Sequence, residues 1–302
     1  MKRKLVKQGV STMMISLPTK WIKDNKLDKG DEISIDEKGP NLIIGASEKK
    51  NSKKEITIEL TEQNYKDLKA FLTHSYRKGF DKIILTGYLA EASKEINSLV
   101  SGILLGFEVV EKGRDRIVVE NISSPDETKY ETILSKVFFI IKEMPNMILN
   151  NSNVLELKET KDHCDKFVLF CRKIISQNKI NEDPILEWEF LTFLTHIQHT
   201  YYYLGEYMRS NKIASNKELE NLISESGNYF NLLFEAHKNK DITQINKINS
   251  LKNKFQYGKC LELISKSKGK DAVAASYLRE IFRWIQISSS PLLSKLLETK
   301  SK

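Results

Sequence analysis

The pattern of apolar residues changes near Pro125, and this change limits the folds that the chain can adopt. Up to about residue 122, short segments alternate between the two-residue period of strands and the longer period of helices. After Pro125, apolar residues recur three or four positions apart in long segments separated by polar breaks. The sequence therefore predicts a multidomain α+β protein in which the helical part takes more than half of the chain.

The helical part, residues 126–302, is predicted to be an antiparallel bundle whose helices share one core. We expect Pro145 to kink or divide the first helix, because proline cannot donate a backbone hydrogen bond. The polar breaks suggest two three-helix units, at about 126–211 and 217–298. The six helices are expected at residues 126–150, 154–178, 184–210, 217–238, 242–266 and 271–298.

Residues 55–122 are predicted to form a small α/β domain with the order β-α-β-α-β-β. Gly79 should end the first of its helices, and Gly113 lies where a hairpin turn is expected. Gly87 follows a strand, but the chain has no GxGxxG and no GxxxxGK[ST] pattern. A nucleotide site in this domain therefore receives little support.

Residues 1–46 form the first predicted domain, and a polar segment at 47–54 is the expected linker. We expect strands at residues 5–6, 14–17, 32–36 and 42–44, with a turn at 8–12 and a short helix at 20–25 that has Thr19 as its N-cap. A few short strands cannot bury a core by themselves. The sequence therefore indicates that this domain dimerises or docks on another surface.

The first domain also begins with a basic run, in which no acidic residue precedes Asp24. Cations on a short β-ribbon can neutralise DNA phosphates, and Ser11 and Thr12 can donate hydrogen bonds to phosphates or base edges. The whole chain of 302 residues carries a formal net charge of +8, which also favours acidic partners. The alternative is a charged N-terminus that is only solvated. The cations of the run are Lys2, Arg3, Lys4, Lys7, Lys20 and Lys23.

Metal and catalytic sites receive less support from the residue pattern. His196 and His199 are spaced to share a helical face and could hold a metal with Glu187 or Glu206, although a histidine pair packed among aromatic residues explains them as well. The run from Asp162 to Asp165 contains four possible ligands, but consecutive helical residues point in different directions. No nucleophile or acid–base pair has a recognisable spacing, so we expect no enzyme.

Three cysteines at scattered positions fit a reducing, cytoplasmic setting better than a disulfide framework. The basic N-terminus lacks the apolar segment of a signal peptide. No apolar run reaches the roughly 18 to 20 residues that a membrane span needs, so no membrane insertion is expected.

One pattern in the first domain consists of Arg3-Lys4-Leu5-Val6-Lys7, Gly9, Ser11-Thr12, Ser16-Leu17-Pro18, Trp21, Leu27, Lys29-Gly30-Asp31 and Ile33. The middle domain adds the segments 76–84 and 106–110. With these residues the chain resembles archaeal PhoU-like phosphate uptake regulators that carry an N-terminal SpoVT/AbrB-type DNA-binding domain. The resemblance is most specific in the first 35 residues, good to about residue 122 and diffuse across the helices.

This resemblance implies a swapped-hairpin β-barrel, in which two chains interleave their strands into one dimeric DNA-binding unit. It places DNA contacts on the first strand, the turn and the short helix. Many AbrB-type domains have an arginine just after the turn glycine, whereas Val10 follows Gly9 here. The resemblance therefore implies fewer side chains that can hydrogen-bond to base edges. The implied DNA-binding residues are Lys2, Arg3, Lys4, Lys7, Ser11, Thr12, Lys20 and Lys23.

The helical part resembles PhoU, whose two three-helix repeats carry carboxylate-rich metal motifs. In the corresponding segments of this chain, Gln198, Tyr202 and Arg283 stand where carboxylates would be expected. The resemblance therefore implies the bundle but not its metal ions, and no cofactor is expected.

Together these observations predict a homodimeric transcriptional regulator linked to phosphate uptake, with a helical bundle that senses or docks a protein partner. One alternative is a PhoU-like interaction protein that docks a transporter or kinase and uses its first domain mainly to dimerise. Another is a PhoU-like metal protein.

Overall fold

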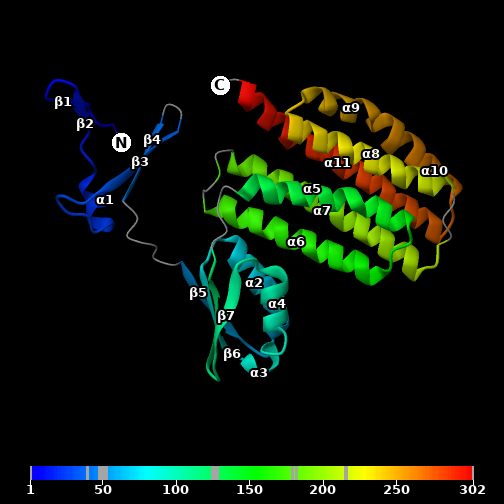
Figure 1. The fold of residues 1–302 in the computed structure, drawn as a ribbon, viewed down its shortest axis with the longest axis horizontal. Coiled ribbons are helices and arrows are strands. Elements are labelled where there is room, and N and C mark those ends of the chain that lie inside the picture. Colours follow the sequence, from blue (N-terminus) through cyan, green and yellow to red (C-terminus); the bar gives the residue numbers. More distant parts are fainter. Residues whose placement is uncertain are drawn as a thin grey trace. The chain divides into compact units, whose positions relative to one another are not determined.

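The computed structural model describes residues 2–38, 41–46, 54–123, 129–177, 180, 183–213 and 217–300. The chain divides into two compact units, Met1–Lys53 and Lys54–Lys302 (Figure 1). The architecture is mixed α+β, with small sheets before a long helical region, as the change near Pro125 predicts. Most of the expected linker at 47–54, and the start of the first bundle helix at 126–128, lie outside the described residues.

The first unit consists of two antiparallel hairpins and one short helix. Strand β1 (Val6–Gln8) pairs with β2 (Thr12–Met14), and β3 (Ile33–Lys38) pairs with β4 (Asn41–Ala46). Each pair is a separate two-stranded sheet in the described part of this unit. Helix α1 (Thr19–Asp24) begins one residue earlier than expected. Its N-cap is Pro18, so the prediction of Thr19 as N-cap is wrong.

The second unit begins with a four-stranded sheet in the order β5-β6-β8-β7. The first two strands are parallel, and the other two pairings are antiparallel. Glycine ends helix α2 as expected: Gly79 has a φ of +78°, a conformation that glycine adopts without strain. The elements are β5 (Glu55–Leu60), η1 (Tyr65–Asp67), α2 (Leu68–Arg77), β6 (Lys82–Gly87), α3 (Leu89–Ala92), α4 (Ile96–Ile103), β7 (Phe107–Lys112) and β8 (Arg116–Asn121).

The helical bundle follows within the same unit, and its boundaries lie within a few residues of the expected ones. Helix α5 continues through Pro145, so this proline does not divide it. The segment expected at 242–266 contains a π-helical stretch, which inserts an extra residue into the helical ladder. The elements are α5 (Tyr130–Leu149), α6 (Val154–Ser176), α7 (Pro184–Ser210), α8 (Lys217–Asn239), α9 (Ile242–Lys252), η3 (Asn253–Lys259), α10 (Cys260–Lys266) and α11 (Lys270–Lys300).

Helix α6 joins the sheet region to the bundle. Figure 1 shows α2 and α4 on one side of the sheet, and α6 packs against both of these helices. Leu169 of α6 belongs to the core of the α/β region, whereas its neighbours Val168 and Phe170 belong to the single core shared by the bundle helices. The ammonium of Lys173 lies 4.3 Å from the ring centroid of Phe107. One helix therefore contributes to both cores.

Candidate nucleic-acid interface

The basic run lies on the first hairpin and the short helix of the first unit. Lys2, Arg3 and Lys4 precede β1, and Lys7 lies within it. Gly9 has a φ of +72° in the turn, which is the left-handed conformation that a tight hairpin turn requires. The eight residues implied as DNA contacts are all exposed: Lys2, Arg3, Lys4, Lys7, Ser11, Thr12, Lys20 and Lys23.

The strand register separates these residues onto two faces of the ribbon. Lys7 pairs with Met13, and Gln8 pairs with Thr12. Because side chains alternate along a strand, Lys7 and Thr12 project to opposite faces. The predicted residues therefore do not form one flat patch on the hairpin. Of the predicted residues on the hairpin, only those that share one face can contact the same DNA groove at one time. The segment before β1 can contact that groove together with them.

Helix α1 presents the remaining two cations. Lys20 and Lys23 are three positions apart, so they share a helical face, and both are exposed. The opposite residues Trp21 and Ile22 are half-buried. The Asn25 side chain fixes the end of the helix by donating to the Trp21 carbonyl oxygen at 2.8 Å.

None of the six cations in this run forms an ion pair within the part of the chain that the structure describes. Cations that have no partner carboxylate remain available to bind an external anion. The run contains six cations and no acid before Asp24. Within the first unit, it is the segment in which positive charge most outweighs negative charge.

The first unit has no core of its own. No described residue of residues 2–46 is buried. The register of β3 and β4 places Ile33, Ile35, Leu42 and Ile44 on one face of the second hairpin. Ile35 is 55 % exposed and Leu42 is 62 % exposed. An apolar hairpin face that is this open in one chain is a candidate interaction surface.

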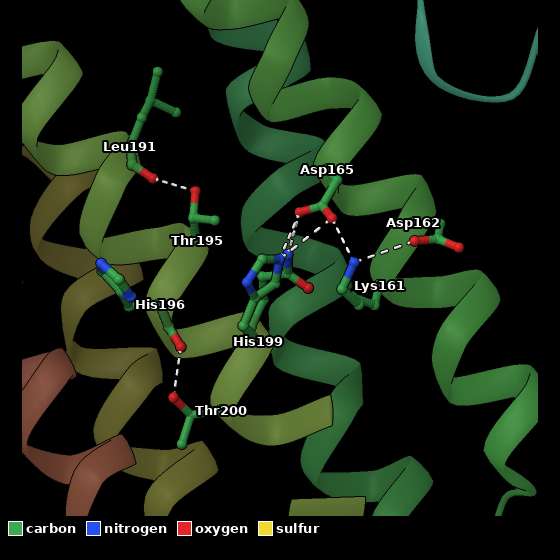
Figure 2. Close-up of polar contacts among 9 residues, drawn as sticks. Lys161, Asp162, Asp165, Leu191, Thr195, His196, His199 and Thr200 are labelled. Atoms are coloured by element: carbon green, nitrogen blue, oxygen red, sulfur yellow. Dashed lines mark hydrogen bonds and ion pairs between the residues drawn. The ribbon is translucent and has the colours of Figure 1, made fainter. Parts of the chain in front are cut away.

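A second polar cluster, centred on Asp165 of α6, lies in the bundle (Figure 2). Asp165 accepts hydrogen bonds from Lys161 Nζ at 2.7 Å, from Gln198 Nε2 at 2.6 Å and from His199 Nε2 at 2.9 Å. Burial raises the pKa of Asp165, but His199 and Lys161 outweigh it, and the pKa lies below its usual value. The residue pattern alone did not predict this cluster. The spacing of Lys161 and Asp165 by four positions was the only local signal for it.

The two histidines of α7 do not assemble with the acids that we considered as metal ligands. His196 stacks on Trp284, with ring centroids 4.5 Å apart, whereas His199 turns to Asp165 (Figure 2). The Glu187 carboxylate pairs with Lys295 and accepts a hydrogen bond from Tyr130. Glu206 accepts a hydrogen bond from the Tyr202 hydroxyl at 2.9 Å. The grouping of both histidines with Glu187 or Glu206 is therefore wrong.

Among the described residues, no three His, Cys, Asp or Glu side chains come together as metal ligands would. The three cysteines, Cys164, Cys171 and Cys260, are free and buried. Burial raises the pKa of Cys260 to about 12, and it raises the pKa of the other two thiols further above the usual range. Thiols with such pKa values are poor nucleophiles at neutral pH.

Comparison with known proteins does not assign the chain to a family. No protein-family model, no curated protein and no solved structure matches it. Within the residues that can be described, no helix has both the length and the apolar character needed to cross a bilayer.

Proposed function

We propose that the protein is a homodimeric DNA-binding transcriptional regulator whose first unit contacts DNA. The observation that carries this proposal is the acid-free run of six cations on an exposed ribbon and helix. Unpaired lysine and arginine side chains on such a ribbon can contact DNA phosphates, and each contact releases condensed counterions. Because Val10 follows Gly9, contacts to the phosphate backbone dominate, and DNA shape contributes to the choice of sequence.

The second part of the proposal is that two copies of the first unit cover each other. The register of the β3–β4 hairpin places four apolar residues on one face, where Ile35 pairs with Ile44, and no described residue of the unit is buried in a single chain. A second copy of the chain carries the same apolar face. Two copies can therefore cover each other across a twofold axis, as in other symmetric dimers. The swapped-hairpin barrel implied by the resemblance is one arrangement that buries this face. It also brings two basic runs to one DNA duplex.

The resemblance to phosphate uptake regulators supplies the proposed biological role. If the regulator acts on phosphate uptake genes, its deletion should change their transcript levels under phosphate limitation. Equal transcript levels in the deletion and parent strains would remove this role without affecting DNA binding.

The direct test measures binding of the full chain to a mixed-sequence DNA duplex as a function of salt. A dimer that contacts about 6 to 10 phosphates should lose roughly 10³ to 10⁵ in affinity between 50 and 200 mM salt. The variant with Arg3→Ala, Lys4→Ala and Lys7→Ala should bind more weakly and show a shallower salt dependence. A dimeric protein with no affinity for DNA at 50 mM salt would overturn the proposal.

A matched control removes the same number of charges elsewhere. Lys66, Lys129 and Lys158 are exposed residues of the second unit. Their replacement by alanine lowers the net charge by the same amount as the triple variant. The control should retain most of the affinity. Equal losses in both variants would show that net charge, and not the basic run, determines binding.

A further inference from the structure

A small cavity lies where helix α6 joins the α/β region to the bundle. It has a volume of about 200 Å³. Helix α2 contributes Lys69 and Thr73 to its lining, α6 contributes Arg172, and α7 contributes Thr195. Its apolar wall comes from Ile103, Val168 and Leu169. The cavity is smaller than the roughly 300–1,000 Å³ pockets that hold drug-sized ligands. It suits a molecule of about one ring and one polar group.

Arg172 is the unusual member of this lining. Its guanidinium lies 5.3 Å from the ring centroid of Trp188, and its Nη2 donates to Thr192 Oγ1 at 3.1 Å. Its Nε is buried and has no hydrogen-bond partner, and no carboxylate forms an ion pair with it among the described residues. Burial, and then the charge of Arg77, lower its pKa. Arg172 as a whole is half-buried, and a partly buried cation without an ion-pair partner is unfavourable, so a bound anion would compensate it.

The lining also includes His199 and two acids, Asp162 and Asp165, and both carboxylates already have hydrogen-bond partners. Asp165 accepts hydrogen bonds from Lys161, Gln198 and His199, and Asp162 accepts one from Lys161. Figure 2 shows the Asp165 carboxylate between His199 and Lys161, and the Asp162 carboxylate directed toward Lys161. Lys161 and His199 therefore offset part of this negative charge, while the charge of Asp165 also acts on Arg172 and raises its pKa against the effects of burial and Arg77.

Helix α2 adds further positive charge beside the cavity. Lys69, Thr73 and Arg77 are spaced four positions apart, so they share one face of the helix. Within the described residues Lys69 has no ion-pair partner, and the Arg77 guanidinium contacts only the ring of His74. The hydroxyls of Thr73 and Thr195 donate to backbone carbonyls of their own helices and remain able to accept.

We propose that this cavity binds a small organic oxyanion, a carboxylate or phosphate monoester with an apolar body. A guanidinium can form two parallel hydrogen bonds to such a group, and Lys69 adds a second charge. The apolar body would lie against Val168, Leu169 and Ile103. The ligand would contact α2, α6 and α7 together, so its binding links the α/β region to the bundle.

The test uses the full chain with four probes: benzoate, phenyl phosphate, inorganic phosphate and neutral benzyl alcohol. Calorimetry should show saturable binding of benzoate or phenyl phosphate, at least tenfold tighter than benzyl alcohol. The first two probes distinguish a carboxylate from a phosphate ligand, and inorganic phosphate shows whether the apolar body contributes. If neither organic anion binds, or if benzyl alcohol binds equally well, the proposal is overturned.

Variants locate the site. Arg172→Gln should weaken binding of the preferred probe at least tenfold, and Lys69→Gln should weaken it less. Lys66→Gln, an exposed change on η1, should leave binding unchanged. The variant with Arg3→Ala, Lys4→Ala and Lys7→Ala should also bind the probe normally, which separates this site from the proposed DNA contacts. Unchanged binding by Arg172→Gln would overturn the assignment. If that variant does not fold, unchanged binding by Lys69→Gln would do so.

Discussion

At the scale of single residues, Asp165 shows how one carboxylate can organise two helices. It accepts hydrogen bonds from Lys161 on its own helix and from Gln198 and His199 on α7. Asp162, one turn away, bonds among the described residues only to Lys161, at 3.2 Å, and its side chain is 42 % exposed. The two aspartates therefore form a matched pair, in which only one has partners on a second helix.

We predict that Asp165→Asn lowers the free energy of unfolding by about 1–3 kcal/mol, because hydrogen bonds to a charged group are worth that much. Asp162→Asn should cost less than about 1 kcal/mol, since exposed ion pairs contribute little. Urea unfolding of the full chain, followed by far-UV circular dichroism, measures both. Equal losses would contradict the proposed role of Asp165.

The contribution of Asp165 should also depend on pH. Its pKa in the folded protein is below that of the unfolded chain, which is about 3.9. The charged carboxylate therefore stabilises the fold above that value, and the stabilisation is lost as pH falls through the lower folded-state pKa. The difference in stability between wild type and Asp165→Asn should be full at pH 7 and should shrink below about pH 4. Unfolding curves at both pH values test this.

At the scale of elements, Gly87 marks a position that only glycine can occupy at the end of β6. Its φ is +83°, and a Cβ there would lie 2.3 Å from the Leu60 carbonyl oxygen. We predict that Gly87→Ala costs at least about 1–3 kcal/mol. Gly102 in α4 has open space around it, and Gly102→Ala should stabilise the protein by up to about 1 kcal/mol. Melting temperatures of the two variants should move in opposite directions.

The start of α7 and the end of α11 are tied by a buried ion pair between Glu187 and Lys295. Glu187 is fully buried, and the Lys295 side chain is 10 % exposed. Removal of one charge from a buried pair costs about 3–5 kcal/mol. We predict this loss for Lys295→Met, and partial recovery in the double variant with Glu187→Gln, whose amide can still accept from Tyr130. Urea unfolding tests this, and a double variant that is no more stable than Lys295→Met would contradict it.

At the scale of the whole molecule, the two units differ in how they are stabilised. The second unit contains two buried cores that meet at α6. The first unit has no buried residue among those described. If the first unit dimerises as proposed, its stability should rise with protein concentration.

We predict that Ile35→Asp dissociates the dimer and weakens DNA binding. Ile35 is 55 % exposed in a single chain, so a monomer should tolerate the change, whereas a dimer that buries this face should not. Leu155→Asp on α6 is the matched control, because Leu155 is 64 % exposed on the bundle. Sedimentation velocity should show monomers for Ile35→Asp and dimers for Leu155→Asp. Dimers in both cases would exclude this face as the interface.

Local signals in the sequence placed the long helices of the bundle to within a few residues. Asp183 precedes Pro184 and accepts hydrogen bonds from Ile185 N and Leu186 N, while Asn153 accepts one from Glu156 N. Such caps act within one turn of the chain, so the residues that determine them are adjacent in sequence. The π-helical stretch at 253–259 was not predicted, because it has no comparable local pattern.

The sequence by itself determined the approximate positions of the long helices, the order of the main α/β elements and the acid-free basic run, since each depends on neighbouring residues. Only the tertiary structure decided which side chains meet. His199 turns to Asp165, 34 positions away, rather than to His196, and Arg172 of α6 lines one cavity with Lys69 of α2. Spacing along a helix fixes which residues share a face, but the packing of that helix against others decides what the face contacts.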